Sequence, residues 1–68
     1  MEPKMKQAQI SAAARYVRTI PTPKKREYAA AYFNFRRGTI AKPEPPANLS
    51  YMAAQTVRMR IDELLKPS

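Results

Sequence analysis

The prolines of this chain restrict where helices can begin and end. The 68 residues include seven prolines and a single glycine. Proline disfavours helix in the residue before it, so Pro21 ends a first segment near Thr19. Pro23 suits the first position of a second helix, and the prolines of 43–46 favour an extended chain. The pattern predicts helices over about 4–19, 23–37 and 49–65, with 39–48 as an extended proline-rich linker.

Apolar residues recur at helical spacing in all three segments, which predicts an all-α fold in one small domain. Thr22 can cap the second helix and Gly38 suits the residue just after it, while Asn48 or Ser50 can cap the third. The predicted core stripes are Ile10, Ala13, Ala14 and Val17; then Tyr28, Ala31, Tyr32 and Phe35, with Ala29 and Phe33 on the opposite side; and last Ala53, Ala54, Val57, Ile61, Leu64 and Leu65.

The core that these stripes can form is thin. Hydrophobic residues make up 44% of the chain, but eleven of them are alanine and only eleven are Leu, Ile, Val or Phe. A chain this short with few large aliphatic residues is of marginal stability on its own. We therefore expect a homo-oligomer, or a protein that a partner stabilises.

Charge narrows the classes of partner. There are 13 Lys and Arg residues against five Asp and Glu, a net charge of +8, and no acid lies between Glu2 and Glu27. Such a balance favours nucleic acid, then an acidic protein surface, then an anionic membrane surface. No apolar run approaches the ~18 residues of a membrane span, and no secretory signal pattern is present, so we expect a cytoplasmic protein, nucleoid-associated if bacterial or viral.

The residue types needed for most catalysis are missing. The chain has no cysteine and no histidine. Asp62 and Glu63 are adjacent and diverge by ~100° on a helix, so they form no convincing carboxylate pair. Asp62 can pair with Lys66 at i, i+4. General acid–base work usually needs histidine or paired carboxylates. We expect no enzyme activity, no metal and no cofactor.

Three cations occupy the first turn of the second predicted helix. Lys24, Lys25 and Arg26 lie at the positive end of the helix dipole, where cations are disfavoured. A purely structural sequence would favour acids there. We therefore predict that these side chains are retained for an external anion, which would also meet the free N–H groups of the helix start.

The same helix carries a second basic pair. Arg36-Arg37 follows Lys25-Arg26 by eleven residues, so both pairs point the same way, ~16 Å apart, with Phe33 between them. Two such pairs suit phosphates on either side of a groove. Phe33 either stacks on a base or is buried against another helix. The predicted nucleic-acid or anion site comprises Lys24, Lys25, Arg26, Phe33, Arg36, Arg37, Arg15 and Arg18.

Other functions remain open. The short connection between the first two helices is shared by helix-turn-helix DNA readers and by any pair of antiparallel helices. On the third helix, a contact surface is predicted at Tyr51, Met52, Arg58 and Met59, which also suit core packing. The main prediction is a nucleic-acid-binding regulator or architectural protein. The alternatives are a module or inhibitor that docks on an acidic protein surface, and a peripheral membrane binder.

Overall fold

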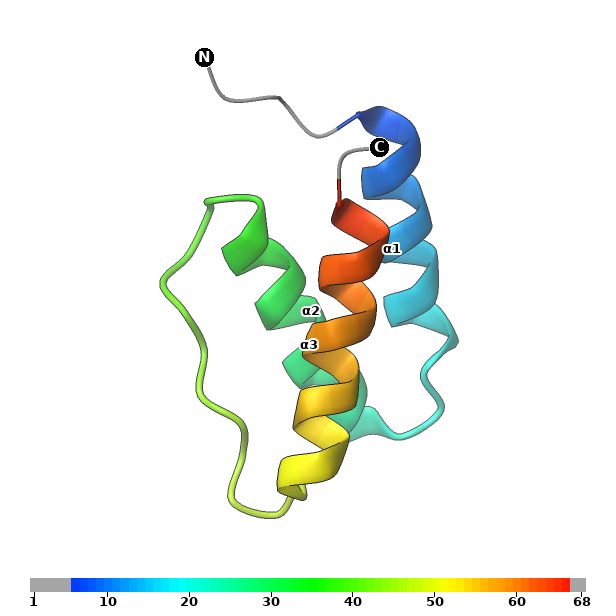
Figure 1. The fold of residues 1–68 in the computed structure, drawn as a ribbon. Helices are drawn as coiled ribbons and strands as arrows, with labels where there is room; N and C mark the ends of the chain where they lie inside the picture. The colour runs from blue at the N-terminus through cyan, green and yellow to red at the C-terminus, as the bar shows by residue number, and fades with distance from the viewer. Residues whose placement is uncertain (1–5, 67–68) are drawn as a thin grey trace.

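Three helices make up the described part of the chain (Figure 1). The computed structural model describes residues 6–66, in which α1 spans Gln7–Thr19, α2 Pro23–Arg36 and α3 Tyr51–Leu65. None of residues 6–66 lies in a strand, so the predicted all-α fold of three helices is confirmed. The predicted start of the first helix, Lys4, lies outside the described residues. Lys6 is extended and precedes α1.

The connection between α2 and α3 determines that α3 runs parallel to α2. α1 and α2 run in opposite directions, whereas α3 runs in the same direction as α2 (Figure 1), and each helix contacts the other two. Residues 38–49, here called the strap, carry the chain back along α2 before α3 begins. The 14 residues of α2 span ~21 Å, and an extended chain gains about 3.1 Å per residue, so the strap is long enough for this return.

One end of the bundle therefore gathers three helix termini. α1 ends there, and both α2 and α3 begin there (Figure 1). We call it the lower end, after its place in Figure 1. Two positive helix dipole ends and one negative end meet at the lower end, because parallel helices place their N-termini together.

Local rules explain most helix boundaries. Ser50 caps α3, because its side-chain oxygen accepts a hydrogen bond from the backbone N–H of Ala53 at 3.1 Å. Pro23 occupies the first turn of α2, as predicted. Thr22 is the N-cap residue of α2, but its side chain makes no capping hydrogen bond. At the start of α1, the Gln9 side chain accepts from the backbone N–H of Lys6 at 2.9 Å.

Gly38 ends α2 in a left-handed conformation, with φ of 83°. The N–H of Gly38 donates to the Phe35 carbonyl at 2.9 Å, and that of Thr39 donates to the Asn34 carbonyl at 3.1 Å. This is the Schellman pattern, in which two free carbonyls at a helix end are satisfied. It also turns the chain into the strap.

The core is small and lies between all three helices. The predicted stripes of α1 and α3 are confirmed at their centres, since Ala13 and Val17 are buried, as are Ala54, Val57, Ile61 and Leu65. One alanine from each helix is fully buried, which lets the helix backbones approach closely. The buried residues are Ala13, Val17, Ile20, Tyr28, Ala29, Tyr32, Phe33, Ala54, Val57, Ile61 and Leu65.

The predicted core face of α2 is wrong in part. Ala29 and Phe33, expected on the opposite side, are buried, whereas Ala31 and Phe35 are only half-buried. The reason is that α2 packs against both α1 and α3, so its buried arc is displaced from the most apolar stripe. The side with Ala31 faces the strap, which covers α2 incompletely.

One carboxylate joins α2 to α3. Asp62 Oδ1 accepts a hydrogen bond from the Tyr32 hydroxyl at 2.7 Å and also pairs with the Arg36 guanidinium. The predicted pair of Asp62 with Lys66 is therefore wrong. Lys66 is already extended, beyond the last turn of α3, so it does not share a helical face with Asp62.

The Tyr32 hydroxyl is sensitive to pH because of this environment. Burial, followed by the hydrogen bond to Asp62, raises the pKa of Tyr32 above its ordinary value of 10.0. Above that value the unfolded chain releases the tyrosine proton while the folded protein retains it. The free energy of unfolding therefore falls as the pH rises through this window.

We expect Tyr32→Phe to lower the free energy of unfolding near pH 7 by about 1 kcal/mol, because a hydrogen bond to Asp62 is lost. The variant should also lose less stability than the parent above about pH 10, since Tyr32 no longer titrates. Urea unfolding at neutral and alkaline pH measures both effects. Tyr51→Phe is the matched control, because Tyr51 is 71% exposed. Equal behaviour of the two variants would contradict the role given to Tyr32.

Gly38→Ala tests the helix end. A Cβ at Gly38 has no atom within 4 Å, so the cost comes from the backbone alone. We expect the free energy of unfolding to fall by about 1–2 kcal/mol, because only glycine adopts this conformation without strain. The substitution Gly38→Asn should cost less, since asparagine tolerates left-handed backbone. Thermal melts of both variants provide the comparison, and an unchanged melt for Gly38→Ala would refute it.

Candidate functional site

Arg26 has a partner inside the protein. Its guanidinium donates to the backbone carbonyl of Ile20 at 3.0 Å. Ile20 is the C-cap of α1, where free carbonyls carry the negative end of the helix dipole. This contact compensates the unfavourable position of Arg26 on the first turn of α2. The prediction that all three cations of this turn are retained for an external anion is therefore not supported for Arg26.

Lys24 and Lys25 differ from Arg26. Lys24 is exposed and Lys25 is half-buried. Within residues 6–66 neither side chain makes a hydrogen bond or an ion pair. The first turns of α2 and α3 also contain no acidic residue. The two lysines thus remain at the positive end of α2 without an internal partner in the described structure.

The second basic pair of α2 does not join the first in one exposed face. Arg36 pairs with Asp62 of α3, so this cation of the predicted site is neutralised within the protein. The Arg37 guanidinium lies 5.5 Å from the centre of the Phe33 ring, a cation–π contact. Phe33 is 8% exposed and belongs to the core. Of its two predicted roles, burial holds, and base stacking would require the core to open.

The predicted cations of α1 are solvent-exposed. Arg15 and Arg18 are both exposed, and α1 contains no acidic residue. Arg15 lines a groove of about 270 Å³ between α1 and α3, with Tyr16, Leu64 and Arg60 among its walls. Arg60 forms an ion pair with Glu63 at 2.9 Å. Arg18 lies in the last turn of α1, at the lower end of the bundle.

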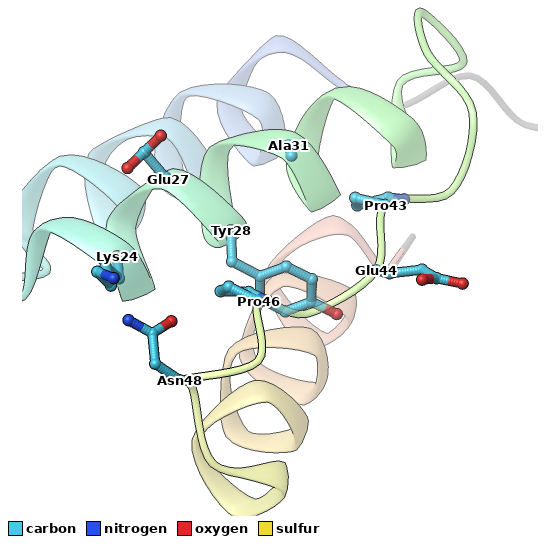
Figure 2. A pocket seen from close by; sticks show the side chains of 8 residues that line it. All are labelled: Lys24, Glu27, Tyr28, Ala31, Pro43, Glu44, Pro46 and Asn48. Carbon is cyan, nitrogen blue, oxygen red and sulfur yellow. The ribbon is translucent and has the colours of Figure 1, made fainter.

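A pocket of about 310 Å³ separates α2 from the strap (Figure 2). Tyr28 and Pro46 form its floor, and the Glu44 carboxylate points away from the Tyr28 ring (Figure 2). Lys24 and Asn48 line the same pocket, so the starts of α2 and α3 lie close together. The sequence pattern indicates the strap only as a linker. In the structure Pro43 and Pro46 are half-buried and line the pocket together with residues of α2.

The predicted contact surface of α3 divides into two groups. Tyr51, Met52 and Met59 are 71%, 70% and 62% exposed. Arg58 is half-buried and donates to the Tyr28 hydroxyl at 3.1 Å, so it connects α3 to α2. For Arg58 the structure thus shows the packing alternative, and its place in a contact surface stays a prediction.

The described residues contain neither a candidate metal site nor a membrane-spanning helix. Within residues 6–66 no three His, Cys, Asp or Glu side chains come together as a metal site would require. None of the described helices combines the length and the apolar character needed to cross a membrane. No protein-family model, no curated protein and no solved structure matches this chain.

Separate replacement of Arg26 and Lys24 tests whether Arg26 stabilises the fold and Lys24 does not. We expect Arg26→Ala to lower the free energy of unfolding by about 0.5–1.5 kcal/mol, because the Ile20 carbonyl loses its hydrogen bond. Lys24→Ala should leave stability unchanged or raise it slightly, since an unfavourable interaction with the α2 dipole is removed. Urea unfolding of both variants tests this. A larger loss for Lys24→Ala than for Arg26→Ala would reverse the assignment.

Proposed function

We propose that the protein binds the phosphate backbone of nucleic acid with its lower end, as a small regulatory or architectural factor. The observation that supports this most is the position of Lys24 and Lys25. Both occupy the first turn of α2, where the dipole disfavours cations, and no described residue compensates them. An anion from outside compensates both the charges and the helix start.

The distribution of acids supports the same surface. Both described ion pairs involve carboxylates of α3, Asp62 and Glu63. α1 has no acid, and the first turn of α2 has none either. The cations on either side of the α1–α2 turn therefore form no ion pair in residues 6–66, although Glu27 and Glu44 line the same pocket as Lys24. We call Arg15, Arg18, Lys24 and Lys25 the basic set.

The lower end also offers backbone donors. The first N–H groups of a helix have no partner within that helix, and two helices begin here. Ser50 satisfies one N–H of α3, and Thr22 satisfies none of α2 through its side chain. Phosphate contacts of this kind set affinity and carry no base sequence. We therefore propose weak sequence preference.

Homo-oligomerisation and a cytoplasmic site of action form part of the same proposal. The buried set contains three alanines and few large aliphatic side chains, which supports association as a source of further stability. A second copy doubles the number of basic sets, and thereby the number of phosphate contacts. An acidic protein surface remains the alternative partner, because it would meet the same cations.

The test is the double variant Lys24→Glu/Lys25→Glu, with Lys42→Glu/Lys66→Glu as the control of equal charge. Lys42 lies on the strap and Lys66 follows α3, so the control changes net charge away from the lower end. We expect the first variant to weaken binding to a short generic duplex at least tenfold, about 1.4 kcal/mol. Its melting temperature should stay the same or rise, because acids suit a helix start. The control should keep most of the affinity.

Salt dependence distinguishes phosphate contact from other binding. Four neutralised phosphates correspond to a log–log slope of about −4 for the parent protein. Anisotropy titrations of a labelled duplex over a range of salt concentrations give this slope. A flat salt response of the parent protein would remove nucleic acid from consideration. Equal losses in the two charge-reversal variants would show that net charge, and not the lower end, governs binding.

A further inference from the structure

The outer side of α3 carries an apolar stripe that no described residue covers. Met52 and Met59 are 70% and 62% exposed, and Thr56 lies between them. The steps of four and three residues place all three side chains on one helical face. The Thr56 hydroxyl donates to the Met52 carbonyl at 2.9 Å, so its polar group is satisfied within the helix. This stripe can be buried without leaving an unpaired hydrogen-bond donor.

Charge identifies what can cover the stripe. The charged residues within α3 are two arginines and two acids, which sum to zero. All four engage partners within the chain: Arg58 with Tyr28, Arg60 with Glu63, and Asp62 with Tyr32 and Arg36. α1 and α2, by contrast, contain six arginines and lysines against a single acid, Glu27. An acidic partner is therefore attracted to α1 and α2, whereas a second copy, itself strongly basic, meets least repulsion at α3.

We infer that two copies of the chain pair through α3 in antiparallel orientation, with Met52 of one copy against Met59 of the other. A two-fold interface repeats each contact, so both methionines of both copies are covered at once. Thr56 then lies near the two-fold axis. This inference rests on the proposed homo-oligomer and is independent of nucleic-acid binding.

The antiparallel register, with Met52 opposite Met59, also places the charges at the helix ends favourably. Antiparallel helices place the positive end of one dipole beside the negative end of the other. In this register Glu63 lies near the start of α3 in the second copy, where the first turn has no acid of its own. The two lower ends then point in opposite directions. A dimer of this form holds two basic sets apart, as expected of a protein that bridges two segments of nucleic acid.

The first experiment measures mass without nucleic acid. Sedimentation equilibrium of the parent chain should show the 7.8 kDa monomer and, at higher concentration, twice that mass. Met52→Glu/Met59→Glu should weaken dimerisation at least tenfold and keep the helical circular dichroism spectrum, because both positions are exposed. Ala8→Glu/Ser11→Glu is the control, with the same charge change at exposed positions of α1, and should dimerise like the parent. A parent that stays monomeric, or a methionine variant that dimerises equally well, would overturn the inference.

The second experiment tests register by disulfide formation, which is possible because the chain has no cysteine. Thr56→Cys should cross-link with itself, and Met52→Cys should cross-link with Met59→Cys. Met52→Cys alone should not, since its two copies are displaced by about 10 Å along the helices, beyond disulfide reach. Efficient self-linking of Met52→Cys with none for Thr56→Cys would refute the antiparallel pairing. The dimer-deficient methionine variant should still bind duplex as a monomer, so failure of the interface and failure of the proposed function are distinguishable.

Discussion

The return of the chain along the strap determines how the rest of this small protein is arranged. Because the strap carries the chain back along α2, α3 begins beside the start of α2 and runs parallel to it. A short loop would have made these helices antiparallel and would have separated their N-termini. The Schellman turn at Gly38 and the cap at Ser50 fix the two ends of the strap. The meeting of two positive helix ends at the lower end follows from this path.

Acidic residues are distributed so that one helix is neutral and the others are basic. Asp62 serves both Tyr32 and Arg36, and Glu63 serves Arg60. The Asp62 contacts attach α3 to α2, and the Glu63 contact lies within α3. Arg15, Arg18, Lys24 and Lys25 have no acidic partner among residues 6–66. The protein thus separates a surface of unpaired cations from a helix whose charges sum to zero. The two proposals made for this protein depend on that separation.

The candidate site could be predicted from sequence only where a residue acts through its own helix. Lys24 and Lys25 are recognisable from their place on the first turn, a local property. Arg26, Arg36 and Arg58 share similar side-chain chemistry, yet each contacts a residue of another segment. Helical spacing cannot reveal those partners, because they lie six or more residues away along the chain. Phe33 is similar, since its burial depends on where α1 and α3 pack.

Sequence alone determined the number of helices, their approximate ends, and the buried stripes of α1 and α3. These features depend on proline, glycine and serine at helix ends and on apolar spacing, which act over a few residues. Tertiary structure alone decided the parallel direction of α3, the buried face of α2 and the division of the cations into paired and unpaired groups. The physical reason is that packing of α2 between two helices, and each contact of a side chain with a distant carbonyl or carboxylate, exists only once the strap has placed α3.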